Sequence, residues 1–227
     1  MSKTRKEYPA IIFGTEGAAK DIYYWLKAAN ERGDGDILKV EGFIERDASL
    51  VGNDAFGVGK VIACDDDLDI LIGKYEKLGI IIPFGSPVIR ERVVKQLEKY
   101  TNVFFPNIIH PSVIYDKDAG TMGIGNHIGP GVVIESVHTF GDFNYVSGAA
   151  HLGHDIKLGS YNSINPSATT AGYVTFEDRC MLGINATVIQ NLTISSDITI
   201  GAGAVVTKNL TEKGIYTGIP ARLFKKG

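Results

Sequence analysis

Two different hydrophobic patterns divide the chain. From Met122 onward an apolar residue returns at every sixth position, and only one member of the series is polar: Met122, Ile128, Ile134, Phe140, Val146, Leu152, Leu158, Ile164, Thr170, Phe176, Leu182, Val188, Ile194, Ile200 and Val206. This period fits neither an α-helix nor a flat strand, which repeat about every 3.6 and 2 residues. It fits a chain that turns a corner every six residues and points one side chain per face inward. Three faces per turn predict a triangular coil, with roughly five coils stacked.

Residues 1–105 instead show short apolar runs that alternate with amphipathic stretches. We predict strands over 10–13, 40–44, 79–82 and 103–105, with helices over 18–30 and 87–100. We expect Val88, Val94 and Leu97 to face the core. The alternating order predicts a small Rossmann-like parallel sheet covered by helices. We therefore expect an α/β domain over 1–105 and an all-β parallel β-helix over 106–227, with a short C-terminal tail.

Composition and charge argue against several classes of protein. The chain has 227 residues and a net charge of −3, so no basic excess suggests nucleic acid. No apolar run approaches the ~20 residues that span a bilayer. Glu7 and Pro9 follow the basic N-terminus, which argues against a signal peptide. Cys64 and Cys180 are far apart in sequence and are interpreted as buried, reduced thiols. These features predict a cytoplasmic protein without a membrane partner.

Short motifs then appear in a fixed order along nearly the whole chain. They occupy residues 12–20, 42–47, 109–112, 153–155, 200–208 and 218–222. Together they resemble the bacterial hexapeptide-repeat N-acetyltransferases of nucleotide-linked amino sugars, a family that includes sialic acid O-acetyltransferases. Residues 212–222 are most similar to the UDP-4-amino-sugar N-acetyltransferase of bacillosamine biosynthesis. The resemblance implies a left-handed β-helix, a homotrimer, and acetyl-CoA bound between neighbouring copies.

The implied reaction transfers an acetyl group to the 4-amino group of a nucleotide-linked, UDP-type 4-amino-4,6-dideoxy sugar for glycan biosynthesis. A sugar ammonium must lose a proton before its nitrogen attacks, and histidine suits this task. Residues His154 and Asp155 match the family's pair of general base and supporting acid. Neighbouring residues on a strand point to opposite faces, so contact between them requires a corner. Of the other histidines, His110 is expected to be structural and His127 to be solvated or capping at a corner, while His138 and His151 could face a groove.

The resemblance also assigns residues to the acetyl-CoA groove. The family's second histidine, near the CoA thiol, corresponds to Ser163. Further contacts, mostly through the backbone, correspond to Ile184 and Ala202. The backbone N–H of Gly172 is placed to polarise the thioester carbonyl. Lys208 begins a basic tail that suits the CoA phosphates.

A second predicted site binds the nucleotide of the sugar substrate. The loop Gly14, Thr15, Glu16 and Gly17 joins a predicted strand to a helix, whose N-terminus favours a phosphate. In the family this loop contacts the nucleotide, and an acidic pair after the second strand contacts the base. That pair corresponds here to Glu45 and Arg46, of which only the first is acidic. Gly85 and Ser86 correspond to a further loop near the sugar nucleotide.

Three alternatives bear on the function. The first, a zinc site, is not supported by the histidine spacing, and the other two remain open. Carbonic anhydrases on the same repeat bind zinc through three histidines, two of them five apart, and no two histidines here have that spacing; no metal is predicted. Sialic acid O-acetyltransferase activity is the enzymatic alternative. The non-enzymatic alternative is a trimeric scaffold protein of polysaccharide synthesis. No cysteine or serine has the setting of an acyl-carrying nucleophile, so direct attack by the amine is the simpler hypothesis.

Overall fold

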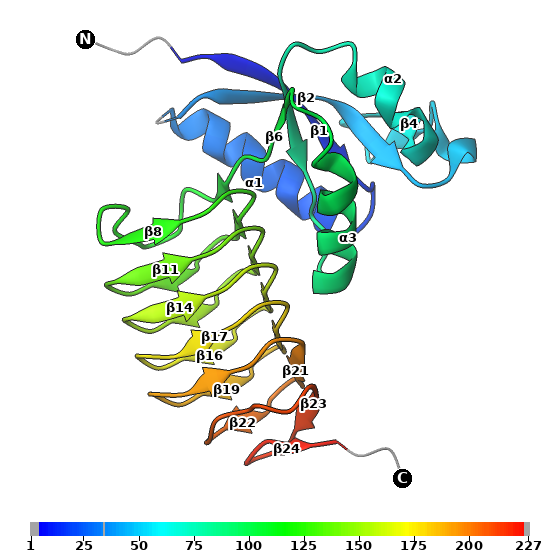
Figure 1. Ribbon diagram of the computed structural model, residues 1–227. Coiled ribbons are helices and arrows are strands. Elements are labelled where there is room, and N and C mark those ends of the chain that lie inside the picture. The colour runs from blue at the N-terminus through cyan, green and yellow to red at the C-terminus, as the bar shows by residue number, and fades with distance from the viewer. Residues whose placement is uncertain (1–4, 34, 225–227) are drawn as a thin grey trace. The chain divides into compact units, whose positions relative to one another are not determined.

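The computed structural model describes residues 5–33 and 35–224. The chain divides into two compact units, which Figure 1 shows as ribbons. The first unit runs to Phe84 and resumes over Ile89–Ile108. The second unit includes Gly85–Val88 and continues from Ile109. Each unit is described by itself below.

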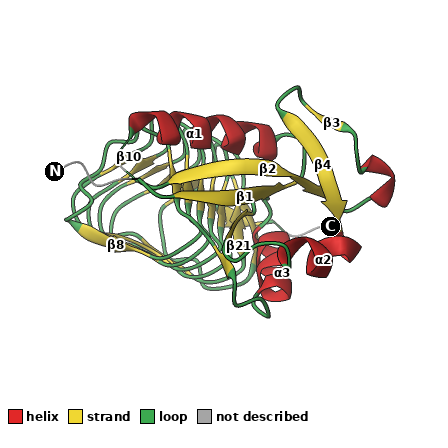
Figure 2. Cartoon of the chain, turned by 90° about the horizontal axis from the view of Figure 1, so that it is seen from above, coloured by secondary structure: helices red, strands yellow, loops and turns green. Residues whose placement is uncertain are grey.

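The first unit contains a six-stranded sheet of order β3-β4-β2-β1-β5-β6. Its strands are β1 (Glu7–Phe13), β2 (Ile37–Glu45), β3 (Asp54–Ala55), β4 (Gly59–Cys64), β5 (Leu78–Ile81) and β6 (Val103–Phe104). All neighbouring strands are parallel except β3 and β4, which are antiparallel. The helices are α1 (Ala18–Arg32), α2 (Leu68–Ile72) and α3 (Pro87–Leu97), with 3-10 turns η1 (Ala48–Leu50) and η2 (Asp65–Asp67). Figure 2 shows α1 on one side of β1 and β2, with α2 and α3 on the other.

Apolar periodicity explains most of this unit. The central strand β1 ends in four fully buried residues, and α1 buries Ile22, Trp25 and Leu26 on one face, as an amphipathic helix should. Helix α3 buries Val94 and Leu97 as expected, but Val88 is 55% exposed, so its predicted core position is wrong. Val88 belongs to the first turn of α3, which clusters with the second unit. The sequence prediction also missed β4 and the short α2.

The second unit is a left-handed parallel β-helix. The six-residue period predicted the stacked coils, and the family resemblance implied their handedness. One sheet contains β10 (Val133–Ile134), β13 (His151–Leu152), β16 (Thr169–Thr170), β19 (Thr187–Val188) and β22 (Val205–Val206). The second contains β8 (Gly120–Met122), β11 (His138–Phe140), β14 (Ile156–Leu158), β17 (Thr175–Phe176) and β20 (Thr193–Ile194). The third contains β7 (Ile108–Ile109), β9 (His127–Ile128), β12 (Tyr145–Val146), β15 (Ser163–Ile164), β18 (Met181–Leu182), β21 (Ile198–Ile200), β23 (Gly214–Thr217) and β24 (Arg222–Leu223). The stack of coils is visible in Figure 1.

The predicted apolar series forms the interior of this β-helix. Every member from Ile128 to Val206 is at most 3% exposed, and only Met122, in the first coil, is partly exposed. Thr170 also points inward, and its hydroxyl accepts a hydrogen bond from the Gly153 N–H at 3.1 Å. A second inward column holds three stacked asparagines, in which Asn144 donates from its backbone and side-chain nitrogens to Asn126 Oδ1 at 2.8 and 3.0 Å. Thr170 and this asparagine column thus form hydrogen bonds with neighbouring coils.

Each coil turns through residues in the left-handed region. Positive φ recurs at every sixth position: Gly125, Gly131, Val137, Phe143, Ala149, Asp155, Tyr161, Ser167, Tyr173, Arg179, Asn185, Asn191, Asp197 and Gly203. Gly or Asn occupies five of these fourteen positions, namely Gly125, Gly131, Asn185, Asn191 and Gly203, whereas Asn126 beside the first turn is buried. A side chain in this region costs roughly 1–2 kcal/mol, so the stacked coils must enforce the turn.

The turns stack into three columns, which we name by one member each. The His154 corner contains residues 136–137, 154–155, 172–173 and 190–191. The Asp142 corner contains residues 124–125, 142–143, 160–161, 178–179 and 196–197. The Ile184 corner contains residues 130–131, 148–149, 166–167, 184–185 and 202–203. Backbone hydrogen bonds join successive members, such as Tyr173 N–H to the His154 carbonyl at 2.9 Å.

Candidate functional site

The predicted base and acid meet at one corner of the β-helix. His154 follows β13, and Asp155 occupies the turn with φ 55°. This turn brings the two side chains together, and His154 Nδ1 lies 2.9 Å from Asp155 Oδ2. An ionised carboxylate only accepts hydrogen bonds, so this contact places the ring proton on Nδ1 and leaves a lone pair on Nε2. The imidazole is 45% exposed. It can therefore accept a proton from a bound molecule.

Gly172 and Tyr173 of the next coil pack against this imidazole. A Cβ on Gly172 would stand 2.4 Å from both Cε1 and Nε2 of His154, so a side chain cannot be accommodated without moving the ring. The Tyr173 ring packs edge-on against the imidazole, with 5.0 Å between ring centroids and an 88° interplanar angle. Asp155, Gly172 and Tyr173 together restrict the orientation of the ring.

Two residues that the sequence analysis did not select hold the backbone beside His154. Glu135 Oε2 accepts the His154 N–H at 3.0 Å, and Glu135 Oε1 lies 3.0 Å from His151 Nε2. These two contacts, the His151 side chain first, lower the pKa of the Glu135 carboxyl. Thr170, which appeared to break the apolar series, binds the N–H of Gly153. One coil takes eighteen residues, and these contacts span nineteen and seventeen, so inspection of positions about one coil away from His154 could have revealed both residues.

The residues predicted to contact CoA lie on more than one part of the β-helix. Ile184 and Ala202 are exposed and stack on the Ile184 corner, where the Gly203 N–H donates to the Ile184 carbonyl at 2.8 Å. Gly172 lies on the His154 corner, and its N–H has no acceptor among the described residues. Ser163 is buried on β15 and donates its hydroxyl to the Gly85 carbonyl at 2.7 Å. Lys208 is exposed after β22. The predicted CoA contacts therefore do not form a single cluster within one chain.

The predicted nucleotide loop follows β1 in the first unit. Gly14 has φ 86°, and its N–H donates to the Ile44 carbonyl at 2.7 Å. Thr15 Oγ1 donates to Glu45 Oε1 at 2.6 Å, which ties the loop to the end of β2. Glu16 is exposed, 4.0 Å from Lys20 Nζ. Gly17 caps α1 without a side-chain hydrogen bond, which leaves the helix N-terminus open to an anion.

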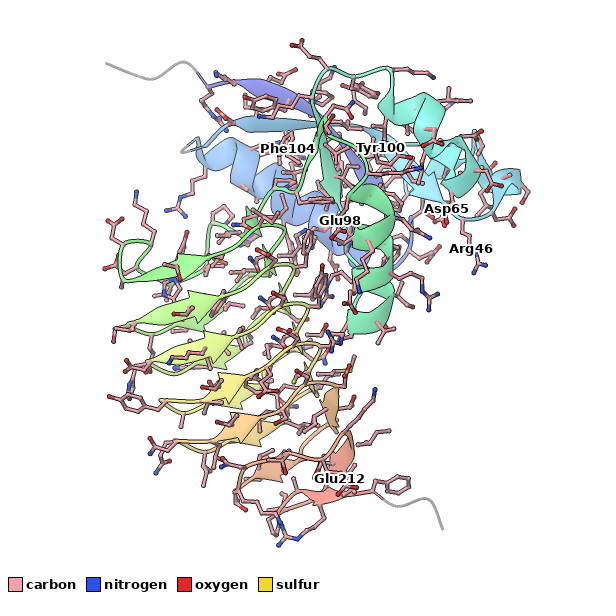
Figure 3. The ribbon with its side chains drawn as sticks, viewed as in Figure 1. Arg46, Asp65, Glu98, Tyr100, Phe104 and Glu212 are labelled. Carbon is pink, nitrogen blue, oxygen red and sulfur yellow. The ribbon has the colours of Figure 1, made fainter. Side chains whose placement is uncertain are left out.

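The carboxyl ends of the neighbouring strands add charged groups to the same unit. Arg46 follows β2 and Asp65 follows β4, and Figure 3 shows both on one side of the unit. Burial raises the pKa of the Asp65 carboxyl, while the charge of Arg46 acts in the opposite direction. Gly85 and Ser86 cluster with the second unit. In parallel sheets, ligands bind at such strand ends.

The remaining histidines and cysteines have structural environments. His127 is 2% exposed on β9, so its predicted solvated corner position is wrong. His138 is equally buried and cannot face a groove, and burial lowers its pKa. His110 Nδ1 lies 2.7 Å from Ser112 Oγ, within its own loop. Both cysteines are free and buried, as predicted. In the described part of the chain, no group of three or more His, Cys, Asp or Glu could hold a metal ion.

Solved structures with a similar fold include two acetyltransferases. Perosamine N-acetyltransferase from Caulobacter crescentus, solved as a histidine-to-asparagine variant with CoA and GDP-perosamine, superposes with a TM-score of 0.84, at 25% identity over 96% of this chain and 97% of that one. The acetyltransferase domain of PglB from Neisseria gonorrhoeae FA1090, in complex with acetyl coenzyme A, gives a TM-score of 0.80 at 22% identity, covering 96% and 100%. The chain resembles the hexapeptide-repeat nucleotide-amino-sugar N-acetyltransferases.

This finding confirms the predicted resemblance and fold class. GDP-perosamine N-acetyltransferase of Escherichia coli O157:H7 is 32% identical over 119 residues, which are 52% of this chain and 52% of that protein. Matches to UDP-3-O-acylglucosamine N-acyltransferase of Bordetella pertussis span only 19% of that protein. The chain thus spans about half or less of the curated relatives it matches. No protein-family model matches. Within the described residues, no helix is long and apolar enough to cross a membrane.

Proposed function

We propose that the protein is an N-acetyltransferase that uses acetyl-CoA to acetylate an amino group of a nucleotide-linked sugar, in the cytoplasm and as part of bacterial glycan biosynthesis. The observation that carries this proposal is the His154 corner. It combines an oriented imidazole with a free Nε2 and an adjacent backbone N–H without an acceptor among the described residues. The resemblance to amino-sugar N-acetyltransferases supplies the substrate class.

The His154 corner fits the needs of acetyl transfer. Bound acetyl-CoA would supply the activated acetyl thioester. The amine forms a C–N bond to the acetyl carbon and its proton passes to His154 Nε2. The C–S bond then breaks, and the CoA thiolate leaves and takes up that proton as the free thiol. Asp155 stabilises the resulting imidazolium by accepting from Nδ1–H. The Gly172 N–H is suited to stabilise negative charge on the acetyl oxygen. Both cysteines are buried and neither lies at this corner, which favours direct attack by the amine.

The same proposal extends to a homotrimer. His154 and Gly172 occupy one corner of the β-helix, whereas Ile184 and Ala202 occupy another. Corners of two neighbouring copies would together supply the base and the predicted CoA contacts. Analytical ultracentrifugation should therefore give three times the mass of one chain, and a single-chain mass would contradict a shared site.

The nucleotide-binding loop forms the second part of the proposal. Gly14, Thr15 and Glu16, together with Glu45 and Arg46, would hold the nucleotide of a 4-amino-4,6-dideoxy sugar. UDP follows from the sequence resemblance, whereas the relatives from Caulobacter crescentus and Escherichia coli are named for GDP-perosamine.

Release of the CoA thiol tests the proposal directly. The protein is incubated with acetyl-CoA and a panel of UDP-, dTDP- and GDP-linked 4-amino sugars and free sialic acid. We expect thiol release with one nucleotide class, and mass spectrometry should show one added acetyl group on the sugar nitrogen. Acetylation of sialic acid would instead establish the O-acetyltransferase alternative. No thiol release with any compound of the panel, together with no CoA binding, would favour the alternative of a trimeric scaffold protein.

A further inference from the structure

Glu135 and Glu177 hold corner residues in the same way, but at different corners. Glu177 Oε2 accepts the Ser196 N–H at 2.9 Å, and Glu135 Oε2 accepts the His154 N–H at 3.0 Å. In both cases the carboxylate reaches nineteen residues ahead, across to the next coil. Only the contact of Glu135 involves the residue that carries the proposed base.

The second oxygen of each carboxylate distinguishes the two contacts. Glu135 Oε1 pairs with His151 Nε2 at 3.0 Å, on the strand that leads into His154. Glu177 uses Oε2 for both Ser196 groups, the N–H and the hydroxyl, the latter at 3.2 Å. The Glu135 carboxylate thus connects two points of a four-residue segment, His151 and His154. A connection of this kind restricts how the backbone of His154 can rotate.

The geometry points to Glu135 as a positioning residue that acts on the base through its backbone. This inference deepens the proposed function and rests on it for its kinetic consequence. The imidazole reaches towards Gly172 in the following coil, whereas Glu135 holds the N–H from the preceding coil. Loss of this hydrogen bond would let the His154 backbone shift while the Asp155 pair moves with it. A displacement of about 1 Å from productive geometry can cost up to 10²-fold in rate.

Steady-state kinetics of matched variants test the inference. Glu135→Ala should lower kcat about tenfold with an unchanged KM for acetyl-CoA, because the base is displaced but the groove is intact. Glu135→Gln keeps an oxygen acceptor for the His154 N–H and should restore kcat to within about threefold of the native value. Glu177→Ala removes the equivalent contact at the Asp142 corner and should leave kcat unchanged. Equal effects of the two alanine variants on kcat, or no effect of Glu135→Ala, would overturn the inference.

A measurement without substrate separates this inference from the proposed function. The His154 imidazole resonances, observed by NMR, should shift or broaden in Glu135→Ala and stay unchanged in Glu177→Ala. Glu135→Ser, which is too short to reach the next coil, repeats the comparison if the alanine variant does not fold. Unchanged His154 resonances in these Glu135 variants would refute the positioning role. Absence of acetyl transfer by the native protein would instead refute only the proposed function.

Discussion

The Asp142 corner and the His154 corner share one backbone geometry but use their polar groups differently. At the Asp142 corner, side chains of neighbouring coils bind the turn N–H groups. Asp142 accepts from Ile124 at 2.8 Å, Ser160 from Asp142 at 3.0 Å, and Asp178 from Ser160 at 2.7 Å. At the His154 corner, only the His154 N–H has such a side-chain partner among the described residues. The Asp142 corner satisfies these donors within the chain, whereas the His154 corner leaves the Gly172 N–H without an acceptor among the described residues.

The side chains at the turn positions follow the same division. The Asp142 corner stacks Phe143 on Tyr161 at 5.3 Å and pairs Arg179 with Asp197 at 2.8 Å, so its turn residues bind each other. At the His154 corner, Asp155 and Tyr173 both contact the imidazole. The left-handed turn residues therefore contact each other at the Asp142 corner, whereas at the His154 corner they contact the imidazole of the proposed base.

Gly172→Ala should have the largest effect among substitutions beside the base. The added methyl group would overlap the His154 ring and force it away from its place, so kcat should fall about a hundredfold. Gly172 has no left-handed φ, so the backbone itself accepts alanine. Steady-state kinetics would measure the loss. Gln190→Ala, at the same corner one coil further on, is the control and should keep native kcat; an equal loss in both variants would point to general disruption.

Asp155→Asn should lower kcat about tenfold. Asparagine tolerates the left-handed turn and preserves side-chain size, so only the negative charge that stabilises the imidazolium is lost. Asp197→Asn at the Asp142 corner removes a carboxylate from an equivalent turn and should leave kcat unaffected. The same kinetic assay checks both variants. Full activity in Asp155→Asn would show that the contact with His154 Nδ1 is not needed.

Thr15→Val tests whether the loop after β1 in the first unit binds the nucleotide. It removes the hydrogen bond to Glu45, loosens the loop, and should raise KM for the sugar nucleotide about fivefold while kcat stays near native. Thr139→Val, at the exposed position of β11 in the β-helix, should change neither constant. An unchanged KM in Thr15→Val would remove this loop from nucleotide binding.

His138→Phe should have the smallest effect, confined to the pH dependence of stability. Burial lowers the pKa of His138 in the folded chain, so the unfolded chain binds a proton more readily as pH falls. This histidine therefore makes the native protein lose stability on acidification. Denaturant titrations at about pH 7.5 and about pH 5.5 should show a smaller acid loss for the variant. An equal loss in both proteins would contradict the effect.

The repeat was predictable because one physical rule applies at every sixth residue. An interior position tolerates almost only apolar side chains, so the series from Ile128 to Val206 identified the β-helix correctly. The elements of the first unit were harder to predict. Only the acidic turn η2 separates β4 from α2, and α2 has five residues, too few to show a helical period. Val88 was misassigned because its helical spacing alone does not say what covers it.

The contacts of the candidate site were predictable only where a local motif marks them. His154 and Asp155 are adjacent in sequence, and the turn that joins them follows from the period. Glu135 and Tyr173 reach the same corner from other coils, and their signal lies in the eighteen-residue stacking distance. His127 and His138 were misread because residues from distant positions in sequence pack against them. His127 contacts the Tyr145 ring, and His138 contacts the Tyr115 ring.

The most direct test compares the turnover of the native protein with that of His154→Ala. The thiol-release assay is run with acetyl-CoA and the best amino-sugar nucleotide of the panel, after circular dichroism and ultracentrifugation have shown equal folding and mass. If Nε2 of His154 removes the amine proton, kcat should fall by about two orders of magnitude or more while CoA binding persists. Near-native turnover in the alanine variant would contradict the assignment of this corner as the catalytic one.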